Sequence, residues 1–177
     1  GVFRSTDDGG NWTKAGLAGK AVSALGLHSA VDIYAGVSAG VFRTTDNGAN
    51  WIQTGLTNIP VQSLAFTSSG WVLAGTRDGI FRSQSNGTSW VKMSLTASVA
   101  NTLVVNASGQ IFVGTSSDGV FQSTDEGATW SALNNGLLNP SVLSLAVSST
   151  GFLIAGSAGS GVFRSVQSTL AIVTQPA

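Results

Sequence analysis

The sequence predicts an all-β protein built from repeated four-stranded units, and three observations lead to this prediction. First, near copies of one segment recur with a period of about 40 residues, because their tryptophans Trp12, Trp51, Trp90 and Trp130 stand 39, 39 and 40 residues apart. Second, each period contains four short apolar runs separated by turn residues, which is the pattern of strands. Third, no stretch carries apolar residues at helical spacing over three turns.

The four runs of each period predict the four antiparallel strands of a β-propeller blade. The first run reads "VSALGL", "VQSLAF", "ANTLVV" and "VLSLAV" in the four copies, and its leucines 25, 64, 103 and 145 have mostly small neighbours, which suits an innermost strand near a propeller axis. The second run is "DIYAG", "WVLAG", "IFVG" or "FLIAG", the third is "GVFR" or a variant, and the fourth follows the tryptophan. A stacked β-solenoid remains an alternative.

The turn between the third and fourth runs has its own chemistry. In "STDDGGNW" the Asp7 carboxylate can accept hydrogen bonds from backbone N–H groups of the turn, Gly9 can adopt a positive φ, and Trp12 returns the chain to the sheet. This segment resembles the Asp-box, or bacterial neuraminidase repeat, whose pattern is Ser/Thr-x-Asp-x-Gly-x-x-Trp. The matching residues are Ser5, Asp7, Gly9 and Trp12; Thr44, Asp46, Gly48 and Trp51; and Ser123, Asp125, Gly127 and Trp130.

Two copies depart from the pattern. The third keeps Ser83, Gly87 and Trp90 but has Ser85 in place of the aspartate, and a fifth beginning, "GVFRSVQST", lacks the glycine and the tryptophan. The resemblance implies a propeller like those of sialidases, xyloglucan-degrading enzymes, sortilin-like receptors and photosystem assembly factors. It also implies that the Asp-boxes are structural and lie away from the substrate-binding face; a ligand or metal role for them is the alternative.

Composition excludes several functions. Eight Lys and Arg residues balance eight Asp and Glu residues, so no basic field attracts nucleic acid or an anionic membrane. The absence of cysteine excludes disulfides and thiolate metal sites. No apolar run approaches the roughly 18 to 20 residues that span a bilayer. We therefore expect no nucleic-acid partner, membrane span, metal or cofactor.

The sequence contains few residues that could act as catalytic groups. A glycosidase generally needs two facing carboxyl groups, and here five of the eight acids belong to Asp-boxes, whereas Asp78 and Asp118 precede glycines in hairpin turns. The resemblance to sialidases would imply an arginine cluster and a tyrosine nucleophile with a glutamate partner, but Tyr34 lies in an apolar run and the only glutamate lies in an Asp-box. We expect His28 to be a turn residue, and the repeated arginines 4, 43, 82 and 164 to form a blade-to-blade ladder.

A candidate binding face remains where the turns between second and third strands meet the links between blades, because loops carry function more often than frameworks do. By repeat position it collects Lys20, Asn58, Arg77, Asp78, Ser117, Asp118, Asn135 and Asn139.

The sequence thus predicts about four propeller blades in residues 1–168, which can belong to a larger ring, and a tail or linker in residues 169–177. Since the chain begins inside a repeat, we expect a fragment or a processed product of a secreted or cell-surface bacterial protein. Its expected function is that of a non-catalytic module that binds a protein or a glycan, or that self-assembles as a structural component. The alternative is a piece of a sialidase-like or xyloglucanase-like enzyme. Low charge and open sheet edges also predict self-association, unless a larger propeller includes the chain.

Overall fold

The computed structural model describes residues 1–84, 86–95, 99–165 and 172–174, and these residues form strands and turns without a helix. The strands make four four-stranded antiparallel sheets and one two-stranded sheet. Each of the four large sheets is a simple meander of consecutive strands, as expected for a propeller blade. The all-β fold of about four blades is therefore confirmed.

We name the sheets by their order in the chain. The half-blade is β1 (Phe3–Arg4) and β2 (Thr13–Lys14). Blade 1 is β3 (Val22–Leu27), β4 (Ile33–Val37), β5 (Gly40–Thr44) and β6 (Ile52–Thr57). Blade 2 is β7 (Val61–Phe66), β8 (Val72–Thr76), β9 (Gly79–Ser83) and β10 (Val91–Lys92). Blade 3 is β11 (Ala100–Val105), β12 (Ile111–Thr115), β13 (Val120–Ser123) and β14 (Ser131–Ala132). Blade 4 is β15 (Val142–Val147), β16 (Leu153–Ser157), β17 (Gly161–Ser165) and β18 (Ile172–Thr174).

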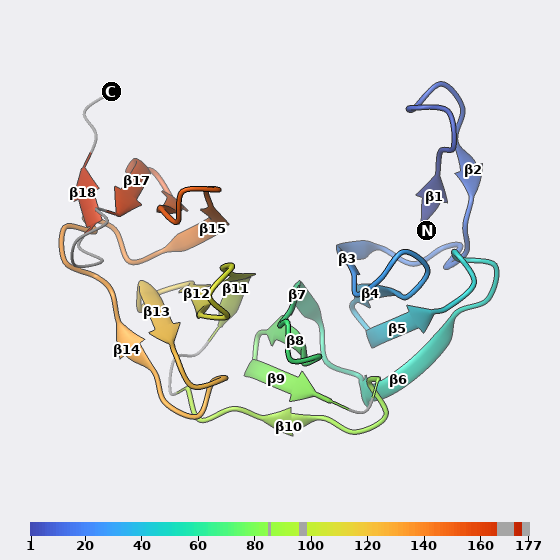
Figure 1. Cartoon of the computed structure of the whole chain (residues 1–177), viewed down its shortest axis with the longest axis horizontal. Coiled ribbons are helices and arrows are strands. Elements are labelled where there is room, and N and C mark those ends of the chain that lie inside the picture. The colour runs from blue at the N-terminus through green and yellow to red at the C-terminus, as the bar shows by residue number, and fades with distance from the viewer. Residues whose placement is uncertain (85, 96–98, 166–171, 175–177) are drawn as a thin grey trace.

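The blades succeed one another along an open arc (Figure 1). Strands β3, β7, β11 and β15 line the inner side of the arc, and the inner strands of neighbouring blades contact one another. The half-blade stands at one end of the arc and blade 4 at the other. We call the turns that resemble the Asp-box the Asp-box turns. Because the strands of a blade alternate in direction, these turns lie on one face of the arc, and the links between blades lie on the opposite face.

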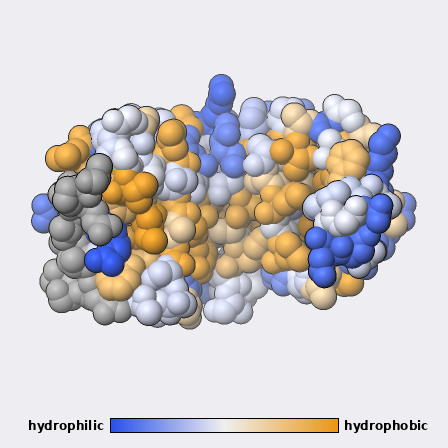
Figure 2. All heavy atoms as spheres, turned by 90° about the horizontal axis from the view of Figure 1, so that it is seen from above, coloured by the Kyte–Doolittle hydropathy of each residue, from blue (hydrophilic) through white to orange (hydrophobic). Residues whose placement is uncertain are grey.

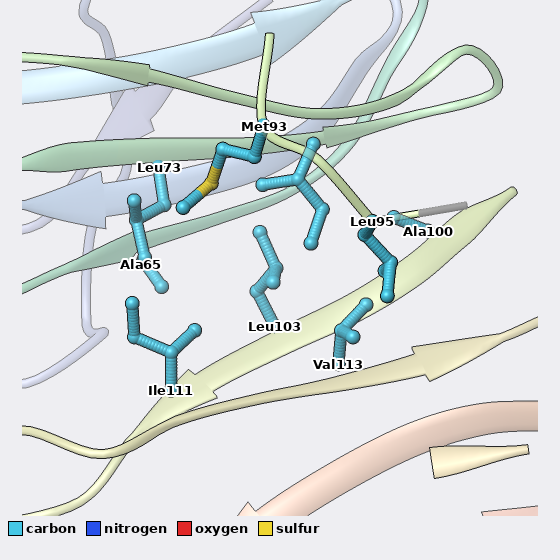
Figure 3. Close-up of a cluster of buried hydrophobic side chains, with 9 residues drawn as sticks. Ala65, Leu73, Met93, Leu95, Ala100, Leu103, Ile111 and Val113 are labelled. Atoms are coloured by element: carbon cyan, nitrogen blue, oxygen red, sulfur yellow. The ribbon is translucent and has the colours of Figure 1, made fainter. Parts of the chain in front are cut away.

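The hydrophobic core consists of three clusters, one between each pair of neighbouring blades. Each blade contributes a forward face, which packs on the next blade, and a backward face, which packs on the preceding one. Figure 3 shows one such cluster, where Leu73 and Met93 of blade 2 meet Leu103 and Ile111 of blade 3. The blades are thus held together by burial of apolar side chains between sheets.

The ends of the arc lack this burial. On the forward face, Val41, Ile80 and Val120 occupy one repeat position and are fully buried, whereas Val162 at the same position of blade 4 is 62% exposed. On the backward face, Leu25 of blade 1 is 53% exposed. Figure 2, which looks into the open side of the arc, shows apolar atoms gathered there.

The number of outer strands differs from the sequence-based count. The sequence has five copies of the third run, but only four of them are followed by the tryptophan of the motif, so it predicted no fourth strand after the last copy, Gly161–Ser165. In the structure such a strand, β18, is present and pairs with β17. This strand lies inside the segment 169–177 that we expected to be a tail or linker. Its pairing needs no Asp-box, because Arg164 lies opposite Val173 in an ordinary antiparallel register.

Candidate functional site

The Asp-box turns are closed by their own side chains. In the second copy, Thr44 Oγ1 donates to Asp46 Oδ1 at 2.7 Å and accepts from the Gly48 N–H at 3.0 Å. The backbone N–H of Asn50 donates to Asp46 Oδ1 at 2.8 Å, and its side-chain amide donates to Oδ2 at 2.8 Å. Since both carboxylate oxygens accept bonds, these hydrogen bonds, led by that of the Asn50 N–H, lower the pKa of Asp46 to about 2.

The first and fourth copies repeat this network. The pKa of Asp7 falls to about 2, mainly through the Ser5 hydroxyl, and that of Asp125 falls to about 2, mainly through the Thr129 side chain. The third copy keeps the backbone of the turn without the aspartate. Asn86 and Gly87 have φ of 55° and 83°, and the Gly87 N–H donates to Ser83 Oγ at 3.0 Å.

The second, third and fourth turns also contact the preceding sheet. Gly48 lies against Ala15, Gly87 against Thr54, and Gly127 against Met93, so that each glycine faces the chain just beyond the start of the previous fourth strand. The indole N–H of Trp51 donates to the Ala15 carbonyl at 2.7 Å, which ties the second turn to the half-blade. These contacts support the interpretation of the Asp-boxes as structural links between blades.

The repeated arginines do not form the expected blade-to-blade ladder. Arg43 Nε donates to Asp32 Oδ1 at 2.6 Å, and Arg82 stacks over Trp71 with 4.4 Å between guanidinium carbon and ring centroid. Asp32 and Trp71 both stand just before the second strand of the arginine's own blade. Arg43 and Arg82 are therefore paired within their own blades. For Arg43 the reason is the β4–β5 register, in which it lies opposite Tyr34, next to Asp32. Arg82 in addition reaches the next blade, where it donates to the Glu126 carbonyl at 2.6 Å.

A cluster of side chains that the sequence did not predict surrounds Arg43. Arg43 binds Asp32 with two nitrogens, and His28 Nδ1 lies 3.2 Å from Asp32 Oδ2, so His28 is a turn residue that contacts the Asp32 carboxylate. Burial raises the pKa of the adjacent Tyr34 to about 12. The Tyr34 hydroxyl is fully buried, and a substrate therefore has no path to it.

A groove of about 550 Å³ opens between blades 1 and 2 on the outer side of the molecule. Residues Ile52 to Gly55 of β6 line it together with the Asp-box of blade 1 and residues 86–88 of blade 2. Arg43, Asp46 and Gln53 supply polar groups to the groove, and Ile52 beside them is largely exposed. The groove escaped prediction because it arises from two turns that are far apart in the sequence.

Several residues of the predicted binding face take part in local contacts, through either the backbone or the side chain. Asn139 Nδ2 donates to the Ala158 carbonyl, and the Asn58 N–H donates to the Ala39 carbonyl at 2.8 Å. Lys20 lies 5.2 Å from the Phe42 ring centroid. Asp78 and Asp118 donate their backbone N–H groups to threonine hydroxyls, as expected of turn residues. Arg77, Ser117 and Asn135 are exposed on the same face as these residues. A binding role for the eight residues stays a prediction.

All eight acids lie in the described part of the chain, and none faces another acid across a cleft that the structure defines. Asp7, Asp46 and Asp125 are bonded within their turns, and Asp32 is paired with Arg43. Glu126 Oε2 accepts a hydrogen bond from the Trp71 indole at 3.1 Å. Within the described residues no three potential ligands of the His, Cys, Asp or Glu type gather to hold a metal ion, and no helix could cross a membrane.

The comparisons with solved structures identify the fold. An ancestral GH74 enzyme aligns with 97% of this chain and 28% of its own, at 20% identity and a TM-score of 0.79. The extracellular domain of a hybrid two-component system from B. thetaiotaomicron aligns with 94% of this chain and 24% of its own, at 16% identity and a TM-score of 0.75. YCF48 bound to D1 peptide aligns with 86% of this chain and 54% of its own, at 17% identity and a TM-score of 0.66.

These structures are propeller proteins, so the chain is similar in fold to propeller modules. It spans at most about half the length of the three chains described above. At identities of 20% or less the similarity shows the fold alone. No protein-family model and no curated protein sequence matches the chain.

Proposed function

We propose that this chain is a non-catalytic, secreted binding module of the Asp-box type that captures an extended segment of a partner protein in the groove between blades 1 and 2. The observation that carries the proposal is the outermost strand β6. It has six residues, whereas the corresponding strands β2, β10 and β14 have two each, and the groove runs beside it.

An outermost strand is suited to this task. β6 pairs with β5 on one side only, and its other edge has no strand neighbour among the described residues. An extended peptide can add to such an edge through main-chain hydrogen bonds, with pockets beside it reading alternate side chains. The Gly55 N–H already donates to the Gly87 carbonyl at 2.7 Å, and Thr54 packs against Gly87, so the exposed part of the edge is Ile52 and Gln53.

The groove offers an exposed apolar side chain, Ile52, beside polar side chains that are held in place by their own chain. Arg43 is bound to Asp32, both carboxylate oxygens of Asp46 accept hydrogen bonds within its turn, and the Gln53 amide donates to the Ala39 carbonyl at 2.9 Å. Main-chain pairing and contact with Ile52 are therefore the interactions that we expect to bind the peptide. Similar propellers support the same interpretation, since YCF48 was solved with a peptide and the two-component-system domain is extracellular.

Selection of peptides from a phage-displayed random library tests the proposal. The 177-residue chain should enrich a sequence family whose synthetic peptides bind wild type, and Ile52→Arg should weaken this binding at least about tenfold by obstructing the edge. Val91→Arg is the matched control, because Val91 follows the tryptophan of blade 2 as Ile52 follows that of blade 1 and is also exposed. Equal binding by wild type and Ile52→Arg would exclude the groove, and binding of xyloglucan or sialyllactose instead would favour a glycan ligand.

The second candidate is a piece of a carbohydrate-active enzyme, which the similarity to GH74 structures favours. The engaged acids oppose it, because none of them is placed to act with a second carboxyl group across a bound sugar. Incubation with xyloglucan and with sialosides separates the two candidates, since any hydrolysis dependent on the chain would contradict the non-catalytic proposal.

We further propose that the chain associates with itself through the ends of the arc. Val162 at one end and Leu25 at the other occupy positions that are buried or half-buried between blades elsewhere, and exposed apolar surfaces of this kind favour association. Light scattering of the isolated 177-residue chain tests this, and a monomer of 17.9 kDa at high concentration would contradict it.

A further inference from the structure

The two ends of the arc carry the same five residues in the same structural role. Gly1 to Ser5 and Gly161 to Ser165 both read "GVFRS". In blade 4 this segment is β17, which pairs with β16 so that Ile154 lies opposite Arg164 and Ala155 opposite Phe163. In the half-blade it is β1, which pairs with β2, and no other described strand pairs with its inner edge. Strand β16 therefore fits two identical partners.

The two competing hairpins differ in the segment that comes after the common strand. After β1 the chain forms a complete Asp-box turn, in which the Gly9 N–H donates to Ser5 Oγ at 2.9 Å and the Asn11 N–H donates to Asp7 Oδ1 at 2.8 Å. After β17 the sequence reads "VQSTLA" and has no aspartate, glycine or tryptophan of that motif. The half-blade hairpin thus has a complete Asp-box turn, and in the 177-residue chain it has no first or second strand beside it.

We propose that, when two copies of the 177-residue chain meet, the half-blade of one copy displaces β17 and β18 of the other, so that β15 and β16 of one chain and β1 and β2 of the other form one four-stranded composite blade. The inference rests on the self-association proposed above and deepens it. In the register of β16 with β17, the transferred Arg4 lies opposite Ile154 and the transferred Phe3 opposite Ala155.

Burial is nearly balanced at the exchanged strand itself and favours the exchange at the neighbouring blade. Phe3 is 52% exposed in the half-blade, whereas Phe163, whose position it would take, is 2% exposed. The residues that the exchange buries and releases at this position are identical, so the exchange of β17 for β1 is nearly neutral. In addition, strands β15 and β16 would lie on the inner side of the second chain's half-blade. There they would cover Leu25 and Leu27 in blade 1 of that second chain, which are both exposed in a single chain.

The number of copies is set by the number of blades. Each chain contributes blades 1 to 3 and half of two composite blades, which makes four blades for each copy. Propellers typically close with about four to eight blades. One copy does not close on itself, because its half-blade and blade 4 lie at opposite ends of the arc (Figure 1). We therefore infer a head-to-tail dimer that forms a ring of eight blades.

Engineered cysteines detect the composite blade directly, since the chain has no cysteine of its own. Opposite residues of antiparallel strands are close enough for a disulfide. Arg4→Cys combined with Ile154→Cys should give a covalent dimer under mild oxidation. Ile154→Cys combined with Arg164→Cys is the matched control, which should give an intramolecular disulfide only if β17 keeps its place.

A pair of charge substitutions gives an independent test. Phe3→Asp should raise the dimer dissociation constant at least about tenfold, because the composite blade would bury the carboxylate. Phe163→Asp should leave the dimer intact, because the exchange releases Phe163 into solvent. The opposite ranking, with Phe3→Asp harmless and Phe163→Asp disruptive, would overturn the exchange.

The outcomes separate this inference from the proposal on which it rests. A dimer cross-linked between positions 4 and 154 supports both. A dimer that forms only the disulfide between positions 154 and 164 keeps self-association and overturns the composite blade. A monomer overturns both, and so does an intramolecular disulfide between positions 4 and 154, which would mean that a single chain closes its own ring.

Discussion

The tightness of the contact between an Asp-box glycine and the preceding sheet can be measured by the stability lost when one methyl group is added to the glycine. We expect Gly48→Ala to destabilise the protein strongly, for two separate reasons. Gly48 has a φ of +90°, which an alanine adopts only with strain. Its new Cβ would also lie 2.7 Å from the carbonyl oxygen and 3.0 Å from the Cβ of Ala15, which is closer than normal contact.

A matched control separates these two causes. Gly70 has the same φ of +90°, but a Cβ added there meets nothing within 4 Å. Gly70→Ala should therefore cost only the backbone strain, about 1–2 kcal/mol. Gly48→Ala should add about 1–3 kcal/mol for overpacking, giving a total loss of about 2–5 kcal/mol. The difference between the two variants measures the rigidity of the contact between the half-blade and blade 1.

Urea unfolding followed by tryptophan fluorescence gives both free energies, provided that all variants are compared at one protein concentration. Gly48→Ala should shift the midpoint to lower urea than Gly70→Ala does. Equal losses of stability at the two positions would refute the reasoning, because the turn would then not be held against Ala15.

The same turns lead to two further expectations. Because the pKa values of Asp7, Asp46 and Asp125 drop from 3.8 to about 2 on folding, their contribution to stability is complete above about pH 4 and is lost as the pH falls to about 2. Urea midpoints between pH 2 and 5 should show this loss, and Asp46→Asn should reduce its slope; an unchanged slope would contradict the shift. Trp51→Ala or Trp90→Ala should cost about 3–5 kcal/mol, and Asp46→Ala should cost less, because a large aromatic ring leaves a cavity between blades. A thermal melt in which Trp51→Ala behaves as wild type would disprove the packing.

The sequence predicted the blades well because a blade is a local structure. Each first-strand run matches its strand at both ends, as "VSALGL" does with β3 and "VQSLAF" with β7. Turn signals and apolar runs that are adjacent in sequence suffice to define such a meander. Strand β18 was missed because no motif precedes it, so that only its pairing with β17 reveals it.

The candidate sites were harder to predict because they depend on distances across the sequence. Arg43 and Asp32 are 11 residues apart, and their ion pair can be inferred only once the β4–β5 register is known. The groove beside β6 needs residue 87 of the next blade, which a pattern within one repeat does not place. Repeat position correctly suggested a structural role for the arginines, but it could not tell pairing within a blade from pairing between blades.

The contacts of the Asp-box turns have a direction, and this bears on how the protein is made. Gly48 rests on Ala15, Gly87 on Thr54 and Gly127 on Met93, so each turn contacts a residue that leaves the ribosome before it. A nascent chain therefore always presents the surface on which its next blade docks, and we expect folding to proceed from the N-terminus during translation. Protease resistance of ribosome-bound chains of increasing length should then appear one blade at a time, at intervals of about 40 residues, rather than in a single step at the end of synthesis.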